Sequence, residues 1–456
     1  MRRHLLDGMS SSRQLALAAS LGAVAGGLVV VDIRVLAAAA TGVVALGALC
    51  SLWRMGDERI AGMAWAGAAF TAPMNGVRVT SFMAVTDVFL VVAVLAMAPS
   101  LALGCRRFSV SAHVGVLAGL AMIATGGVIG TMFAAHPEAS LVVIAKFVLA
   151  AAGSVAAFAL WRPNQRQLSG FCALWLAGAL VSSAWALTLD PHRPGRPFGL
   201  ATHPNHLGLV CVLGTCIALG FVLERHRATR LAGLLSCPVL IAALLASGSR
   251  AALVGLLVAG VTVLVLSGRV RLAIRAAMVA STVGVLVLTS ALHLSGTGLD
   301  RLFGNASASR SDAERVGKLV NSYDRFAAHP LTGEGFEFAQ EAHNVYLQVL
   351  VAAGPLGLVG LVVVVSFTLS GILRSRRRPG TRATGDRALL AGLGAGSVGY
   401  LAAGAFQNIL WDRYLWLYVA AAVTLAAQVR PARPWPEAIE FPGPAVSAFP
   451  ISATDR

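Results

Sequence analysis

The chain has 456 residues, of which 57% are hydrophobic and only 12% charged, and its mean hydropathy is +0.75. A soluble domain of this length needs far more charge to cover its surface, so the composition excludes an ordinary soluble protein. The formal net charge is +16, but the basic residues are spread over short segments between apolar blocks. Because no continuous basic domain is present, no nucleic-acid partner is expected.

Apolar blocks follow one another along the chain, and each is long enough to cross a bilayer as a helix. Helices are required because lipid cannot satisfy the backbone of an open strand. We therefore predict an all-α, polytopic transmembrane protein of about 12–14 spans. The predicted spans are 14–31, 35–53, 60–74, 80–98, 113–135, 139–161, 168–188, 206–223, 231–247, 251–267, 273–294, 345–373, 388–410 and 414–429.

Charges around the spans predict the orientation of the chain. The basic segment from Met1 to Arg13 precedes an apolar run and then a second span, which is the layout of a signal anchor. With the N-terminus inside, every predicted inside loop carries arginine, as the positive-inside rule requires. We expect a multi-pass protein of the cytoplasmic (inner) membrane with both termini cytoplasmic and one large extracytoplasmic loop, residues 296–343.

The large loop contains a predicted helix. Residues Ser311 to Glu314 fit a capping box, and apolar residues then recur at helical spacing as far as Pro330, which ends the helix. Arg315, Lys318 and Arg325 share the opposite side. We therefore expect a cationic amphipathic helix near the outer leaflet, which binds either anionic lipid or a substrate.

The first candidate site segment is the outer loop from Arg196 to Gly208. Pro204 is excluded from a helix interior and Asn205 is a good N-cap, so the eighth span is expected to begin here with free N–H groups facing outward. A helix N-terminus beside Arg196 is a natural anion site. A polar loop with a helix cap is the simpler alternative.

The second segment is the short turn before Arg250, which opens the tenth span. The turn leaves almost no loop, so Arg250 is expected at the outer membrane surface, where an unpaired charge is costly and usually has a partner. Snorkelling of this arginine to lipid headgroups is the alternative.

The third segment contains His343, where the large loop re-enters the membrane. Imidazole gains and loses a proton near neutral pH, so His343 suits a general base at this boundary. The alternative is a histidine that only caps a helix or lies on the surface.

Taken together, the stretches Arg196 to Gly208, Ser249-Arg250 and Pro330 to Leu358 resemble the O-antigen ligase and polymerase superfamily. These are membrane glycosyltransferases of the GT-C type that act on polyprenyl-diphosphate-linked glycans. The order and spacing of the segments agree with the family pattern, in which an HN pair opens the span after the large loop. The resemblance implies that His343 is catalytic and that Arg196 and Arg250 bind the donor diphosphate.

Six further residues, from these segments and from the predicted helix of the large loop, are expected to support the site: Asn344, Asn205, His203, Arg315, Lys318 and Glu341. The sequence departs from the family where an acidic residue often follows the HN pair within the helix, because Ala352 and Ala353 occupy that stretch. The nearest carboxylates are those of Glu334 and Glu341.

The resemblance implies an enzyme of surface polysaccharide assembly in the cell envelope. It would transfer or polymerise a glycan linked to a polyprenyl carrier such as undecaprenyl diphosphate, on the outer face of the membrane. The implied partners are this donor, a glycan, lipid or protein-linked acceptor, and membrane lipids; ligase and polymerase remain alternatives. No cofactor is expected, and no metal, since the predicted outer face carries no Asp-rich or His/Cys cluster.

The expected regions of the chain follow from these assignments. They are N-terminal transmembrane helices (1–188), transmembrane helices with donor-binding outer loops (189–295), the large extracytoplasmic loop (296–343), C-terminal transmembrane helices (344–429) and a proline-rich cytoplasmic tail (430–456).

A polytopic transporter or a lipid or glycolipid flippase is the main alternative function, since many spans and ionisable residues inside the membrane fit it as well. Two such residues, Lys146 and Asp87, lie within predicted spans, and we expect structural partners for both. The enzyme is favoured because the polar segments gather on one predicted face. A scaffold or sensor would leave the grouping of His343 with the arginines unexplained.

The glycine-rich run from Gly392 to Gly399 predicts close helix packing rather than a nucleotide site.

Overall fold

The computed structural model describes residues 57–80, 83–102, 111–190, 196–224, 226–267, 306–336, 342–376, 384–408 and 410–429, with the single positions 271 and 274. The predicted signal anchor, the spans 14–31, 35–53 and 273–294 and the tail 430–456 lie outside them. The described residues form helices and no strand apart from one isolated bridge between Arg78 and Ala84. The predicted all-α class is confirmed.

The helices of the first half are α3 (Asp57–Thr71), α4 (Val85–Ala102), α5 (Val114–Thr131), α6 (Pro137–Val148), the π-helical turn η1 (Leu149–Gly153), α7 (Ser154–Trp161) and α8 (Gln165–Thr188). Those of the second half are α9 (Pro204–Val222), α10 (Arg227–Ala246), α11 (Arg250–Ser267), α14 (Ala306–Ala328), α15 (Val345–Arg376), α16 (Thr384–Gly404) and α17 (Arg413–Gln428). Each predicted span that falls within the described residues contains one of these helices.

Among the described residues, seven helical stretches are long and apolar enough to cross a membrane, which confirms a polytopic helical membrane protein. They are Val114–Thr131, Pro137–Trp161, Gln165–Thr188, Pro204–Val222, Arg227–Ala246, Arg250–Ser267 and Val345–Ser375. Helix α9 lies at the centre of the bundle, where it packs against α8, α10, α11 and α16. Its residues are apolar on every side and nearly all buried, as expected of a helix surrounded by others.

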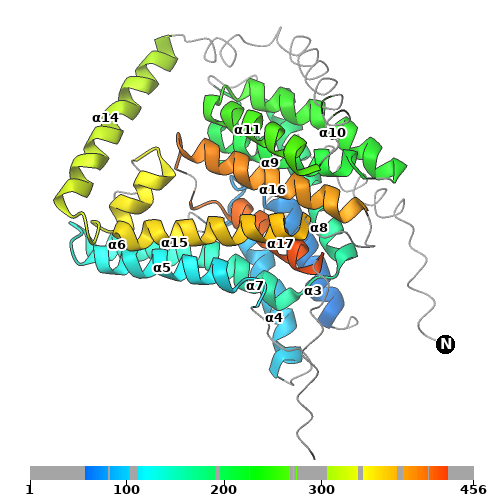
Figure 1. Cartoon of the computed structure of the whole chain (residues 1–456), viewed down its shortest axis with the longest axis horizontal. Coiled ribbons are helices and arrows are strands. Elements are labelled where there is room, and N and C mark those ends of the chain that lie inside the picture. The colour runs from blue at the N-terminus through cyan, green and yellow to red at the C-terminus, as the bar shows by residue number, and fades with distance from the viewer. Residues whose placement is uncertain are drawn as a thin grey trace, which may run out of the picture.

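Helix α14 lies apart from the bundle (Figure 1). It lies across one end of α5 and α15, which run side by side. It confirms the amphipathic helix predicted in the large loop, and it ends at Ala328, shortly before Pro330. The predicted start was wrong, because α14 begins at Ala306 rather than at Ser311. Residues 306–310 contain neither glycine nor proline, so nothing in them stops the helix from extending past the capping-box pattern.

Glycines let the main helix pairs approach backbone to backbone. A Cβ atom added at Gly119 of α5 would lie 2.5 Å from the carbonyl oxygen of Gly360 in α15, and one added at Gly360 would lie 2.5 Å from that of Gly119. In the same way, a Cβ at Gly399 of α16 would lie 2.4 Å from the carbonyl oxygen of Gly255 in α11. The predicted packing role of the run from Gly392 to Gly399 is thus confirmed.

Helix α15 is broken near its start. Gly354 has φ 62° and ψ −166°, a conformation that a side chain would strain, and Pro355 follows it. The break separates a half-helix, residues 345–353, from the long remainder of α15 (Figure 1). The backbone N–H groups of Glu334 and Gly335 donate to the carbonyls of Val351 (2.8 Å) and Ala352 (3.1 Å), which the break leaves without helical partners.

Asp87, which lies within a predicted span, has the structural partner expected for it. Asp87 forms an ion pair with Arg413, and its carboxylate also accepts a hydrogen bond from the backbone N–H of Ala84 (2.8 Å). Lys146 is exposed on α6, so its side chain is directed away from the core.

Substitution of Gly119 by valine is expected to lower the melting temperature of the detergent-solubilised protein. The added methyl groups would push α5 away from Gly360, and overpacking of this kind costs about 1–3 kcal/mol. Gly260→Val on α11 is the control, because nothing lies within 4 Å of a Cβ added there. Equal melting temperatures for the two variants would contradict the close contact between α5 and α15.

Candidate functional site

The candidate site lies where three chain segments meet: the start of α9, the turn from α10 to α11, and the start of α15. Arg196 joins the first two segments. Its Nε donates to the carbonyl of Ser247 (2.6 Å), and its Nη2 donates to Oδ1 of Asn205 (2.8 Å). The segments found in the sequence around Arg196 and Arg250 are therefore in direct contact.

The start of α9 differs in detail from the prediction. The helix begins at Pro204, and the N-cap is His203 rather than Asn205. Nδ1 of His203 accepts the backbone N–H of Asn205 (3.1 Å). The shift has a simple cause, because proline favours the first helical position and makes the preceding residue the cap. Asn205 is thereby released from capping and serves instead as the acceptor for Arg196.

Arg250 opens α11, as predicted, and its expected partner comes from α14. The guanidinium forms a hydrogen-bonded ion pair with the carboxylate of Asp312. Nη1 of Arg315 lies 3.8 Å from the same carboxylate oxygen. Asp312 therefore lies between two cations that belong to different helices. Sequence analysis missed Asp312, whose only signal was the alternation of acidic and basic residues along α14.

His343 has a strained backbone. Its φ of 46° is in the left-handed region, which is rare for residues other than glycine and costs about 1–3 kcal/mol. The next residue holds this conformation in place. Oδ1 of Asn344 accepts the N–H groups of Tyr346 (2.9 Å) and Leu347 (3.0 Å), so it caps the half-helix, while its Nδ2 donates to the carbonyl of Ala405 (3.0 Å).

The imidazole of His343 lies within the electrostatic influence of α14. Partial burial lowers the pKa of His343 first, and the positive charges of Lys318 and Arg315 lower it further, while Glu314 acts in the opposite direction. Nζ of Lys318 lies 3.0 Å from Oε1 of Glu314. Two of the predicted supporting residues, Arg315 and Lys318, therefore act on His343, and they favour its neutral form.

The turn after α16 connects the His343 and Arg250 segments. Ala405 accepts the hydrogen bond from Asn344, and Nε2 of Gln407, two residues further on, donates to Oγ of Ser249 (3.2 Å). Ser249 directly precedes Arg250. The start of α15 and the start of α11 are thus held at the same end of the bundle through one short turn.

A buried carboxylate that sequence analysis missed lies close to the start of α9. Asp412 lies just before α17 and is only 6% exposed. Its carboxylate accepts hydrogen bonds from the hydroxyls of Tyr414 (2.8 Å) and Tyr400 (3.2 Å). It also accepts one from Nδ2 of Asn75 (3.2 Å). Nδ1 of His206 lies 3.4 Å from its Oδ1. Its sequence neighbour Arg413 opens α17 and forms an ion pair with Asp87.

The remaining carboxylates are less informative. Glu341 lies outside the described residues. Oε2 of Glu334 lies 4.0 Å from Nη1 of Arg325, so this acidic residue faces α14. Among the described residues, no group of three or more His, Cys, Asp or Glu side chains could hold a metal ion.

Comparison with known proteins finds one family match. The family model for O-Antigen ligase matches residues 235–362, which run from within α10 into α15 and include Arg250, α14 and His343. Arg196 lies outside the match. No curated protein matches the chain significantly. The resemblance seen in the sequence is confirmed for this stretch: residues 235–362 of this multi-pass membrane protein match the O-antigen ligase family.

Proposed function

We propose that this protein is a glycosyltransferase that transfers or polymerises a polyprenyl-diphosphate-linked glycan on the outer face of the cytoplasmic membrane. The observation that carries the proposal is the meeting of His343, Arg250 and the cations of α14 at one end of the bundle, within the matched domain. A half-buried imidazole whose lowered pKa favours the neutral form is suited to accept a proton, and the arginines are suited to a diphosphate.

The reaction follows from these side chains. An acceptor hydroxyl attacks the anomeric carbon of the donor sugar, and the bond from that carbon to the diphosphate oxygen breaks. The hydroxyl proton passes to His343, and the bond electrons leave with the polyprenyl diphosphate. Arg250 and Arg315 stabilise the negative charge that develops on the leaving group, and the partly buried setting strengthens their effect.

Arg196 has a positioning part in this proposal. Its guanidinium donates to the carbonyl of Ser247 and to Asn205. It thereby holds the turn that carries Arg250 against the start of α9. We assign the direct contact with the donor to Arg250, and the orientation of its turn to Arg196.

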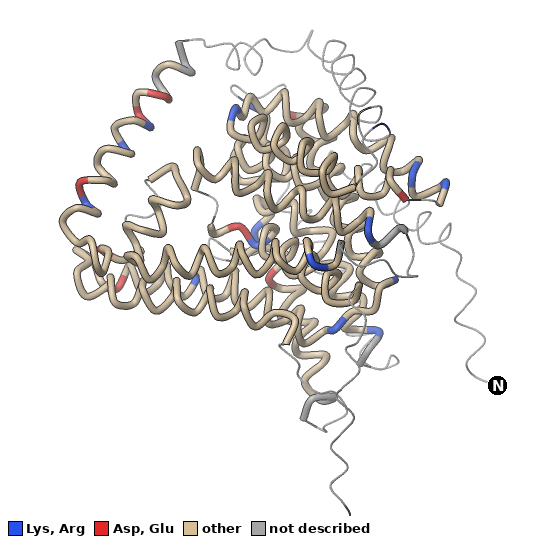
Figure 2. The backbone as a smooth tube through the Cα atoms, viewed as in Figure 1, with Lys and Arg blue, Asp and Glu red and all other residues tan. Residues whose placement is uncertain are grey.

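In the proposed orientation, α14 lies on the extracytoplasmic side of the membrane. Lys and Arg residues are spread along the side of the bundle opposite α14, whereas on α14 basic and acidic residues alternate (Figure 2). Helix α10 starts with Arg227 and Arg230 at the far side, and α15 ends at Arg374 and Arg376. By the positive-inside rule the far side is cytoplasmic, and both termini are proposed to lie there.

A lipid or glycolipid flippase is the second candidate, because the break in α15 at Gly354 resembles the interrupted helices that transporters use. Reconstitution in vesicles with a polyprenyl-diphosphate glycan separates the two functions. A glycosyltransferase forms a new sugar linkage and releases polyprenyl diphosphate, whereas a flippase moves the intact donor between leaflets.

Replacement of His343 by alanine is expected to lower kcat by about 10²-fold or more, because the acceptor hydroxyl would lose its proton acceptor. Turnover of a reconstituted polyprenyl-diphosphate glycan measures the effect. His136→Ala is the matched control, since the His136 side chain is 65% exposed and lies before α6. Wild-type turnover by correctly inserted His343→Ala protein would exclude the assignment.

The pH dependence of kcat/KM gives a second test of the same residue. The neutral imidazole accepts the proton and is present above the pKa, so the lowered pKa of His343 should move the acid limb below the ordinary histidine value of 6.5. Lys318→Met removes a nearby positive charge, so the pKa should rise and the limb should move to higher pH.

The control for this pH experiment is Arg325→Met, which removes a cation of α14 that faces Glu334 rather than His343. Its acid limb is expected to coincide with that of the wild type. A limb that stays in place in Lys318→Met would show that His343 does not set the pH dependence.

Asp312→Asn is expected to lower the KM for the donor about two- to fivefold with little change in kcat. A change of this size corresponds to the small free energy of a partly exposed ion pair. The reason is that Asp312 occupies the guanidinium of Arg250, where the donor diphosphate is proposed to bind. Asp324→Asn, on the exposed side of the same helix, is the control. A raised KM in Asp312→Asn would mean that Asp312 is needed to hold α14 in its binding position.

A further inference from the structure

His206 and Asp412 form an imidazole–carboxylate pair at the start of α9. Nδ1 of His206 lies 3.4 Å from Oδ1 of Asp412 and 2.9 Å from Oγ1 of Thr202. Nδ2 of Asn75 lies 3.3 Å from the same ring nitrogen and donates to the same carboxylate oxygen (3.2 Å). The other ring nitrogen, Nε2, has no partner among the residues that the structure describes, so it is open to a ligand.

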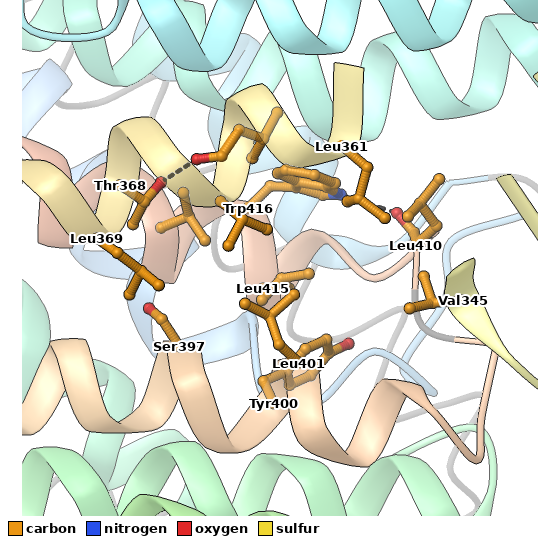
Figure 3. Close-up of a pocket in the computed structure, with 13 residues that line it drawn as sticks. Val345, Leu361, Thr368, Leu369, Ser397, Tyr400, Leu401, Leu410, Leu415 and Trp416 are labelled. Carbon is orange, nitrogen blue, oxygen red and sulfur yellow. Dashed lines mark hydrogen bonds between the residues drawn. The ribbon is translucent and has the colours of Figure 1, made fainter. Parts of the chain in front are cut away.

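The carboxylate of Asp412 is closed off on its second oxygen. The hydroxyls of Tyr400 and Tyr414 both donate to Oδ2. Beyond Tyr400 lies a cavity between α15, α16 and α17, whose walls present mainly hydrocarbon. The side chains on these walls include Leu401, Leu410 and Trp416 (Figure 3). Since hydrocarbon lies on that side, the negative charge of Asp412 acts at short range on His206.

The first turn of α9 brings the pair next to the turn that carries Arg250. A Cβ atom added at Gly208 would lie 2.9 Å from Cβ of Ser249, so the two segments touch. The hydrogen bonds of Arg196 join the same two segments. His206 precedes Gly208 by two positions, and its side chain is 26% exposed. The pair therefore lies in the part of the bundle where the donor diphosphate is proposed to bind.

The charges around His206 are opposite to those around His343. The cations of Lys318 and Arg315 act on His343, whereas the charged group in contact with His206 is the carboxylate of Asp412. A carboxylate beside an imidazole orients the ring and stabilises a positive charge on it. Two titratable groups in opposite surroundings divide the roles of base and acid between them, so His343 is suited to take a proton and His206 to give one.

Other charged groups lie around this pair without replacing it. Helices α8 and α10, which pack against α9, carry their charged residues at the far end from His206. At the near end, the titratable and charged groups are His203, with its ring centre 6.1 Å from that of His206, Asp190, which accepts two backbone N–H groups, Arg250, which pairs with Asp312, and Arg413, which pairs with Asp87.

We propose that His206, oriented and charged by Asp412, is the general acid that protonates the leaving diphosphate. The inference rests on the proposed function and adds the proton donor to it. As the bond from the anomeric carbon to the phosphate oxygen breaks, its electrons stay on that oxygen, and the proton on Nε2 of His206 passes to it. The acceptor's proton goes to His343, and both histidines then exchange protons with water at the outer face.

The chemistry of the leaving group favours such a donor. Cleavage turns an inner phosphate into a terminal one, which gains a second ionisation at about pH 6. Imidazole exchanges its proton near neutral pH, so transfer between the two groups is nearly balanced in free energy. An arginine stabilises the developing charge but stays protonated, so it delivers no proton. The arginines and His206 therefore have complementary roles.

Two donor analogues test the assignment through the leaving group, with the full-length protein in vesicles. A CH₂ group in place of the oxygen between the two phosphorus atoms makes the leaving group more basic than a CF₂ group does. His206→Ala is expected to lower kcat about tenfold more with the CH₂ donor than with the CF₂ donor, because a basic leaving group depends more on an acid. An equal loss with both donors would overturn the proposal.

The matched control for this comparison is His226→Ala. His226 is exposed before α10, at the opposite end of the bundle. Its replacement should retain the wild-type kcat with both donors.

The pH dependence of kcat/KM tests the pair without an analogue. A general acid acts only while it is protonated, so activity should fall at high pH, and His206→Ala should lose this basic limb. Asp412→Asn keeps the shape of the side chain but removes the negative charge, so the basic limb should move to lower pH. Asp324→Asn on α14 is the control and should leave the limb in place. A basic limb unchanged in both His206→Ala and Asp412→Asn would exclude the acid.

These outcomes separate the inference from the proposed function. If the wild-type protein forms no sugar linkage, the glycosyltransferase assignment falls and the acid falls with it. If sugar transfer proceeds and requires His343, while His206→Ala shows the same loss with both donors, the acid assignment alone is wrong.

Discussion

The break in α15 at Gly354 is the constraint on which the candidate site depends. A helix that stops near the membrane exposes carbonyl groups that lipid cannot satisfy, and each costs several kcal/mol. Glu334 and Gly335 satisfy the carbonyls of Val351 and Ala352 with their own N–H groups. The end of the large loop and the half-helix therefore have to fold together. Their joint structure sets where the chain enters α15, and so where His343 lies.

The charges around His343 form a second, coupled constraint. Arg250, Arg315 and Lys318 would repel one another if they gathered at one end of a membrane protein without counter-ions. Asp312 and Glu314 supply those counter-ions from α14 itself. The large loop thus supplies its own counter-ions to this group of cations. Partial burial lowers the pKa of His343, and the same cations lower it further, since they outweigh the opposing effect of Glu314.

Much of the fold could be predicted from the sequence, because a bilayer demands helices of a certain length and hydropathy reports that length. The positions of His343 and Arg250 at helix starts could also be predicted, since both lie where apolar blocks begin. Their partners could not. Asp312 reaches Arg250 across 62 positions of the sequence, and such a pairing depends on how α14 lies over the bundle. Helix starts were the least certain detail, because neighbouring residues compete for the cap, as His203 and Asn205 do.

Tyr400 shows how the polar and apolar parts of the structure meet. Its ring lines the cavity between α15, α16 and α17, while its hydroxyl donates to the buried Asp412. Asp412 in turn lies beside His206 near the start of α9. One side chain therefore separates a hydrocarbon-lined space from a hydrogen-bonded network that reaches the Arg196 segment. Such a boundary keeps the charge of Asp412 and its hydrogen bonds away from the apolar walls, where an unpaired polar group would be costly.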